Sequence, residues 1–174
     1  NPLGTMQDLG MFSMTNNFDN EIEILRSRTL IKKVVNDLGL YISLSEERTL
    51  GYNIPLYKSS PVNVYMTPEE AEKLEASVKL KIQYTKDGKL TVKAEYKLNE
   101  EEQTLEHSFD KLPAVLSTPV GILGFTVNDA ILNDTIRPIE ENIYLVGYIA
   151  SPTIVAENYS ENLNVEPASK TTTI

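Results

Sequence analysis

The stretch VKLKIQYTKDGKLTVKAEYKL, Val78–Leu98, decides the fold of this chain. Apolar and polar residues alternate from Val78 to Tyr84, and the alternation resumes from Leu90 to Leu98. A period of two predicts two strands with one apolar face each, and Asp87-Gly88 between them predicts a turn. We therefore expect a β-hairpin over residues 77–98.

The register of this hairpin follows from the length of its loop. A two-residue Asp-Gly loop would set Tyr84 opposite Thr91 and place apolar side chains opposite polar ones. A three-residue loop, with Gly88 left-handed at a bulge, keeps one face apolar throughout. The expected pairs are then Tyr84 with Leu90, Ile82 with Val92, and Leu80 with Ala94.

Before the hairpin, Asn20–Leu38 reads as helix, and Gly39 is placed to end it. The apolar positions fall on two roughly opposite sides, Phe18, Ile22 and Leu25 on one and Leu30, Ile31, Val34, Val35 and Leu38 on the other. Either one helix is buried on both sides, or Ser27 caps a second helix and the chain bends there. We favour the bend, because two faces of one helix in a soluble domain are rarely both covered. The second side is expected to pack on the domain's own sheet.

The remaining chain adds strands and short helices. Strands are expected at 40–44, 61–66, 102–109, 120–127, 142–149, 163–166 and 170–174, and helices at 67–75 and 152–159. These elements predict an α+β domain, with a mixed, mostly antiparallel sheet and the 77–98 hairpin packed against the N-terminal helical region, 19–38. Residues 1–17 read as a loosely ordered lead-in, and 18–174 as a single domain. The final Thr-Thr-Thr-Ile has strand character, so we expect a segment cut from a longer protein.

The composition of the chain argues against nucleic-acid binding and against sites built from cysteine. The chain has 174 residues and a formal charge of −9, from 25 acidic and 16 basic residues. This balance argues against nucleic acid, whose binding needs concentrated Lys and Arg. There is no cysteine, so the chain forms no disulfide and no thiolate metal site.

Residues that could carry catalysis are few. His107 is the single histidine, and its place in a strand predicts a packed or rim residue. The adjacent acids Glu69/Glu70, Glu100–Glu102 and Glu140/Glu141 fall at helix starts or turns, where acids are common without catalysis. Neither phosphate-binding glycine motif occurs. We expect no catalytic residue, no metal and no cofactor in this segment.

The opening helix also carries a family resemblance. Glu21–Leu40 reads E-I-E-I-L-R-S-R-x-L and then K-V-V-x-D-L-G-L, and Leu56–Pro61 reads L-Y-K-S-S-P before a strand. Together with Asn158–Ile174, these segments resemble the Wzz-type polysaccharide chain-length determinants (polysaccharide co-polymerases). The resemblance is closest to the extracytoplasmic domain of bacterial capsular-polysaccharide tyrosine autokinases. It covers roughly residues 18–66 and 150–174, and it implies that the segment stops before the domain's C-terminal helices.

The resemblance implies a non-catalytic oligomerisation domain that regulates the length and export of capsular or exopolysaccharide. It implies a place on the periplasmic side of the bacterial inner membrane, between two membrane helices, in a protein whose autokinase branch adds a cytoplasmic tyrosine kinase. The implied partners are further copies in a ring, the polymerase, an outer-membrane export protein and the growing polysaccharide. Glu21, Glu23, Arg26 and Arg28 are our candidate interface residues; a solvated helix face with local salt bridges is the simpler reading of them.

Two other function classes stay open. A carbohydrate-binding or adhesin-like surface module would predict an exposed aromatic cleft. A polysaccharide-processing enzyme would need two carboxylates facing each other about 5–10 Å apart across a pocket.

Overall fold

A computed structural model describes residues 23, 27–48, 51–132 and 142–163. The helices are α2 (Arg28–Leu38), α3 (Pro68–Ala71), α4 (Asp129–Leu132) and α5 (Pro152–Asn162). The strands are β1 (Ile42–Glu47), β2 (Asn53–Pro55), β3 (Val62–Tyr65), β4 (Val78–Tyr84), β5 (Leu90–Leu98), β6 (Glu101–Phe109), β7 (Ala114–Thr118), β8 (Gly121–Val127) and β9 (Ile143–Ile149).

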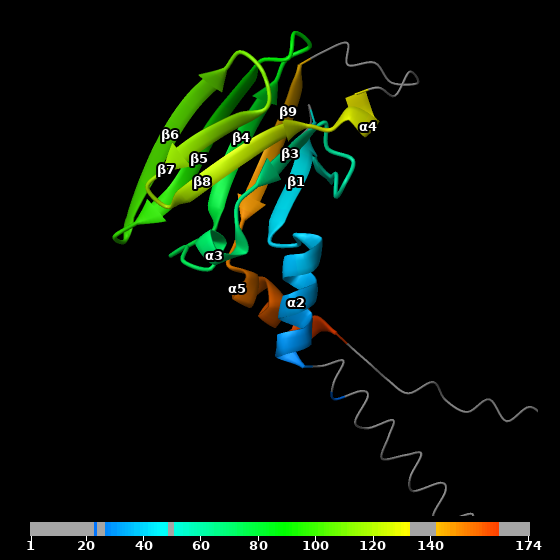
Figure 1. Cartoon of the computed structure of the whole chain (residues 1–174), viewed down its shortest axis with the longest axis vertical. Coiled ribbons are helices and arrows are strands. Elements are labelled where there is room, and N and C mark those ends of the chain that lie inside the picture. The colour runs from blue at the N-terminus through cyan, green and yellow to red at the C-terminus, as the bar shows by residue number, and fades with distance from the viewer. Residues whose placement is uncertain (1–22, 24–26, 49–50, 133–141, 164–174) are drawn as a thin grey trace, which may run out of the picture.

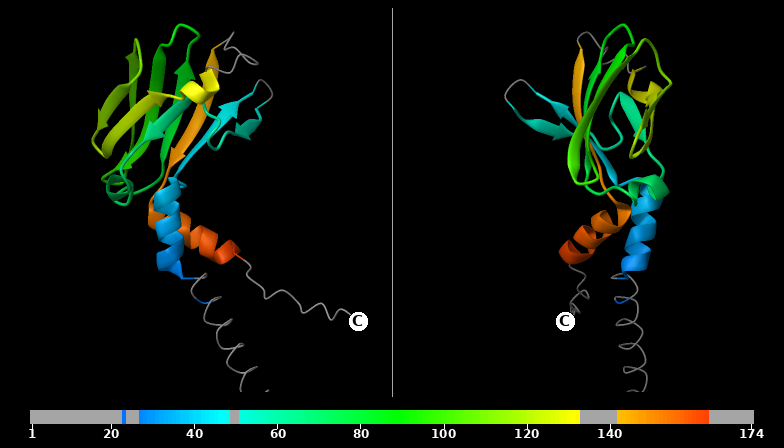
Figure 2. Two further views of the ribbon diagram at one scale, coloured as in Figure 1. Left: turned by 45° about the vertical axis from the view of Figure 1, so that its right-hand side comes forward. Right: turned by 90° about the vertical axis from the view of Figure 1, so that its left-hand side faces the viewer.

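The strands form two sheets that face each other (Figure 1). The larger sheet has six strands in the order β2-β1-β9-β4-β5-β6, and the smaller has three in the order β3-β8-β7. Every strand pair of the described residues is antiparallel. Helices α2 and α5 lie against each other and extend from one end of the two layers, as both views of Figure 2 show.

The hairpin at the centre of the larger sheet confirms the predicted register. Tyr84 pairs with Leu90, Ile82 with Val92, and Leu80 with Ala94. Gly88 has a left-handed φ of 83°, as the three-residue loop requires. The apolar residues of both strands are buried from Val78 to Tyr84 and from Leu90 to Tyr96.

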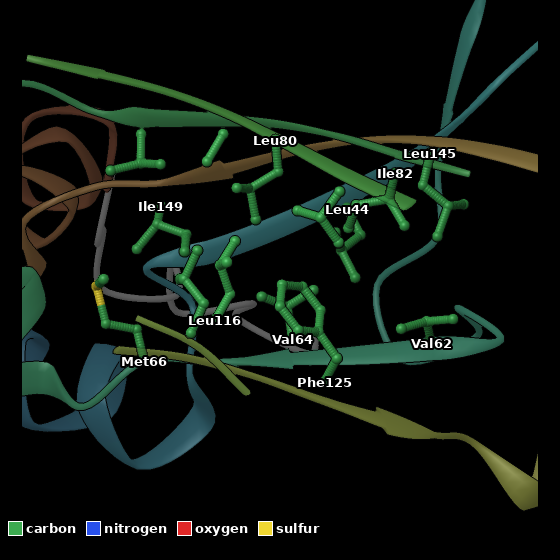
Figure 3. Close-up of a cluster of buried hydrophobic side chains, with 14 of the residues drawn as sticks. Leu44, Val62, Val64, Met66, Leu80, Ile82, Leu116, Phe125, Leu145 and Ile149 are labelled. Atoms are coloured by element: carbon green, nitrogen blue, oxygen red, sulfur yellow. The ribbon is translucent and has the colours of Figure 1, made fainter. Parts of the chain in front are cut away.

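The core fills the space between the two sheets (Figure 3). From the larger sheet come Leu80, Ile82, Leu145 and Ile149, and from the smaller one Val62 and Phe125, each at most 2% exposed. The core therefore depends on long-range contacts between the two sheets.

The structure confirms the α+β class and changes its arrangement. Two antiparallel sheets replace the single mixed sheet that we expected. The apolar face of the hairpin is covered chiefly by the smaller sheet, while α2 reaches this core through Val35, with Ile31 partly buried against it. The body of α2 packs on α5.

Several element predictions also need correction. The strand expected at 40–44 is β1, at 42–47, and the helix expected to run to Leu74 or Glu75 ends at Ala71. The strands β2 and β7 and the helix α4 were not predicted. The strands expected at 163–166 and 170–174 fall outside the described residues, apart from Leu163, which caps α5.

Candidate functional site

Helix α2 begins where the sequence suggested a break. Ser27 has an extended backbone, with φ −60° and ψ 121°, and the helix starts at Arg28. At the other end Gly39 is left-handed at φ 66°, and its N–H donates to the Asn36 carbonyl. The Leu40 N–H donates to the Val35 carbonyl, which completes a Schellman cap. The start at Ser27 and the end at Gly39 are both confirmed.

The structure describes two of the four candidate interface residues, Glu23 and Arg28. Glu21 and Arg26 lie outside the described residues, and Glu23 has helical backbone geometry and is exposed. The Arg28 guanidinium lies 3.6 Å from the carboxylate of Glu157 on α5, and both side chains are largely exposed. Arg28 therefore makes an ion pair with a second helix of the same chain, which is not one of the local salt bridges within a helix face that the simpler reading expects.

A polar cluster ties α2 and α5 to the body of the domain. The Lys32 ammonium donates to the Thr153 hydroxyl at 2.7 Å and lies 3.2 Å from a Glu72 carboxylate oxygen. Glu72 also accepts from the backbone N–H and the hydroxyl of Thr153. Desolvation raises the pKa of Glu72, but hydrogen bonds from Thr153 and Lys32 outweigh it, so this pKa lies below its usual value. We call Lys32, Glu72 and Thr153 the Glu72 clamp.

One side of α2 presents apolar side chains to solvent. Leu30, Val34 and Leu38 follow one another at i, i+4 and i+8; Leu30 is half-buried, and Val34 and Leu38 are 42% and 54% exposed. Of the five apolar residues expected to pack on the sheet, Val35 is buried in the core, and Ile31 is partly buried against it. We call Leu30, Val34 and Leu38 the α2 stripe.

Among the acids considered for catalysis, the carboxylate of Glu70 has a structural role. Glu70 accepts hydrogen bonds from the Thr67 hydroxyl and from the Ile122 backbone N–H, at 3.0 and 3.2 Å. Glu75, outside the groups considered, accepts the backbone N–H groups of Glu100 and Asn99, which lower the pKa of its carboxyl. Glu140 and Glu141 fall outside the described residues.

His107 lies at the edge of the larger sheet. His107 is an exposed residue of the edge strand β6, with its ring edge-on to Phe109 at 4.6 Å, which confirms the rim position. Within residues 23, 27–48, 51–132 and 142–163, no group of three or more His, Asp or Glu side chains could hold a metal ion. None of the helices described there is long and apolar enough to cross a membrane.

The outer face of the larger sheet, away from the core, is polar. Four lysines and several glutamates lie on it, together with Tyr144 and Tyr148 of β9, which are 48% and 45% exposed. A hollow of about 220 Å³ crosses this face, and the neighbouring strands β1, β9, β4, β5 and β6 all contribute to its lining. The lining includes Glu47, Tyr144, Lys81, Thr91, Lys93 and Glu106. A second hollow of about 500 Å³ lies on the same face, with Lys79, Lys97 and Thr104 in its lining.

Neither the exposure of the α2 stripe nor the hollows on the outer face of the larger sheet were predicted from the sequence. The α2 stripe was found as an apolar cluster but assigned to the domain's own core. The lysines of β4 and β5 were read only as the solvated side of a hairpin. The usable signal was the shared parity of Tyr144 and Tyr148 in β9, which places two aromatic side chains on the outer face.

No family model, no curated protein and no solved structure matches this chain.

Proposed function

We propose that this is a non-catalytic assembly domain that regulates the chain length and export of a bacterial capsular or exopolysaccharide. In this proposal it lies on the periplasmic side of the inner membrane, in a protein of the kind that can carry a cytoplasmic tyrosine kinase. The observation that carries the proposal is the α2 stripe, because a regulator of this kind acts by contacts with other copies and with the polymerase.

The α2 stripe has the geometry of a helix contact. Residues at i, i+4 and i+8 lie on one side of a helix, and α5 covers α2 elsewhere. Fully burying an exposed Val or Leu side chain stabilises by about 1.5–3 kcal/mol. The stripe would therefore gain from a partner helix or sheet. The roles found for Glu70 and Glu75 in caps and turns support a domain that acts by binding.

The test introduces charge into the stripe. Val34→Glu combined with Leu38→Glu, made in the full-length protein in its own bacterium, should shift the polysaccharide length distribution and reduce the size of the detergent-extracted assembly. Ile122→Glu is the matched control, because Ile122 is 52% exposed on the outer side of the smaller sheet. Protein levels should stay equal in all strains. An unchanged length distribution and assembly size in the double variant would overturn the proposal.

A further inference from the structure

Strand β6 is a long edge of the larger sheet (Figure 1), without the short length, the proline or the bulge that protect many edges from pairing. The other edge strands that the structure describes, β2, β3 and β7, have three, four and five residues, and β2 contains Pro55, which has no N–H to donate. β6 has nine residues, and each of them pairs with β5 in an unbroken register. Among the described strands, β6 pairs with β5 alone, so its outer edge can accept a further strand.

The two turns that flank β5 determine which backbone groups of β6 face outward. Asn99 and Glu100 have φ of 52° and 66° between the paired Leu98 and Glu101, which makes a two-residue turn of type I′. Such a turn closes on a hydrogen-bonded pair, and bonded and non-bonded pairs alternate along an antiparallel ladder. The bond from the Thr85 N–H to the Lys89 carbonyl at 2.9 Å gives the same alternation from the other side of β5. The odd-numbered residues of β6 therefore bond to β5. The N–H and C=O groups that face outward belong to Glu102, Thr104, Glu106 and Ser108.

The glutamates of β6 decide the register in which a second copy of β6 fits this edge. Residues directly opposite each other share a face of the sheet, so odd-numbered residues must meet odd-numbered ones. With Leu105 opposite the partner's Leu105, Thr104 lies opposite the partner's Glu106, and Glu102 opposite the partner's Ser108. No like charges are then directly opposed. A shift by two residues in one direction sets Glu102 against the partner's Glu106, and in the other direction Glu106 against the partner's Glu106, and both arrangements are unfavourable.

The same register also satisfies the outward backbone groups of β6. Glu102 and Thr104 meet the partner's Ser108 and Glu106, and all of these residues have outward N–H and C=O groups. Two such residues in an antiparallel pair exchange both of their hydrogen bonds. In either shifted register one of the four outward residues lies beyond the end of the partner strand. The backbone and the side-chain charges therefore favour one and the same pairing.

We propose that two copies of this chain pair edge to edge through β6, antiparallel about Leu105, so that their larger sheets become one continuous sheet. This contact has twofold symmetry and closes on two copies, whereas a ring of copies needs a head-to-tail contact. It uses no residue of the α2 stripe and does not rest on the proposed function. A contact along one strand is small, and each copy carries a charge of −9, so the dimer is weak and forms at high protein concentration.

The first test changes the charge that faces the partner's Glu106, and sedimentation equilibrium of this chain at physiological salt measures the dimer dissociation constant. Thr104→Lys creates two opposite-charge pairs by symmetry and should lower this constant about fivefold. Thr104→Glu creates two like-charge pairs and should raise it about fivefold. Ser117→Lys and Ser117→Glu, at an exposed position of the edge strand β7, make the same changes in net charge and should shift the constant far less.

The second test uses the wild-type chain and follows amide hydrogen exchange by NMR at low and at high protein concentration. Exchange at Thr104 and Glu106 should slow as the concentration rises, because their N–H groups enter the new ladder. Exchange at Gln103 and Leu105 should change little, because their N–H groups already bond to β5. Added salt should strengthen the dimer, because it screens the repulsion between two negatively charged copies.

Several outcomes would contradict the β6 dimer. Exchange at Thr104 and Glu106 that is independent of concentration would overturn it, as would a chain that remains monomeric at every concentration. Equal effects of Thr104→Lys and Thr104→Glu, or effects no larger than those of the Ser117 variants, would also overturn it. Polysaccharide length in the α2-stripe variant tests the proposed function independently of these measurements.

Discussion

Two features of the fold could be predicted from single glycine residues that adopt a positive φ. Gly39 and Gly88 both have positive φ, at 66° and 83°, and each ends or reverses an element. Both were found from sequence, because a glycine after a periodic segment is a strong local signal. By contrast, the positive φ of Glu100 in the β5–β6 turn has no sequence signal, although its neighbour Asn99 is of a residue type that often adopts positive φ.

Gly88→Ala tests the left-handed turn. The substitution should destabilise the domain by about 1–2 kcal/mol, because a Cβ at φ 83° is strained even though only the Tyr84 hydroxyl lies near, at 3.9 Å. Urea unfolding provides the measurement. Gly124→Ala is the control: its Cβ would meet Tyr65 at an ordinary 3.6 Å, and its φ is not positive. Equal losses in both variants would show that conformation at Gly88 is not the cause.

Among the helices and strands, elements with a clear periodic pattern and clear end signals were predicted, and elements that lack these signals were missed. β4, β5 and β6 alternate over seven to nine residues, and α5 starts with a proline at its first position. β2 has only three residues, all exposed, so it lacks an alternating pattern that a sequence could reveal. The α2 stripe was detected correctly as a periodic apolar set, but periodicity does not tell what covers it.

Glu72→Gln tests the Glu72 clamp, which joins α2, the end of α3 and α5. The variant should lose about 0.5–1 kcal/mol of stability at pH 7, a small value because the Glu72 and Lys32 side chains are 35% and 41% exposed. The folded-state pKa of Glu72 lies below the usual 4.5, so its contribution is present above that value and lost as pH falls through the folded-state pKa.

Urea unfolding of the wild type and of Glu72→Gln between pH 7 and pH 2.5 measures this effect. The two stability curves should converge at the acid end. Glu161→Gln, an exposed position on α5, serves as the control and should follow the wild type throughout. A difference between wild type and Glu72→Gln that persists at pH 2.5 would contradict an origin in the carboxylate charge.

At the scale of the whole molecule, the layer arrangement could not be predicted. Each strand's buried side was evident from alternation, but the strand order β2-β1-β9-β4-β5-β6 brings β9 between β1 and β4. The β1–β9 pairs join residues about 100 positions apart and the β4–β9 pairs residues about 60–70 positions apart, and no local pattern encodes either. The two hollows on the outer face depend on the same strand order, since five neighbouring strands line the first. Neither hollow could therefore be predicted from the sequence.

Phe125→Ala tests whether the two sheets fold as one unit. Phe125 of β8 is 1% exposed and lies in the core between the sheets (Figure 3). The centroid of its ring is 6.3 Å from that of Phe109 on β6. Removing the ring should cost about 3–5 kcal/mol. Ile122→Ala, on the same strand but 52% exposed, should cost well under 1 kcal/mol. Far-ultraviolet circular dichroism and tyrosine fluorescence should report one coincident urea transition in each variant. Separate transitions, or similar losses at Phe125 and Ile122, would mean that the smaller sheet is not an integral part of the core.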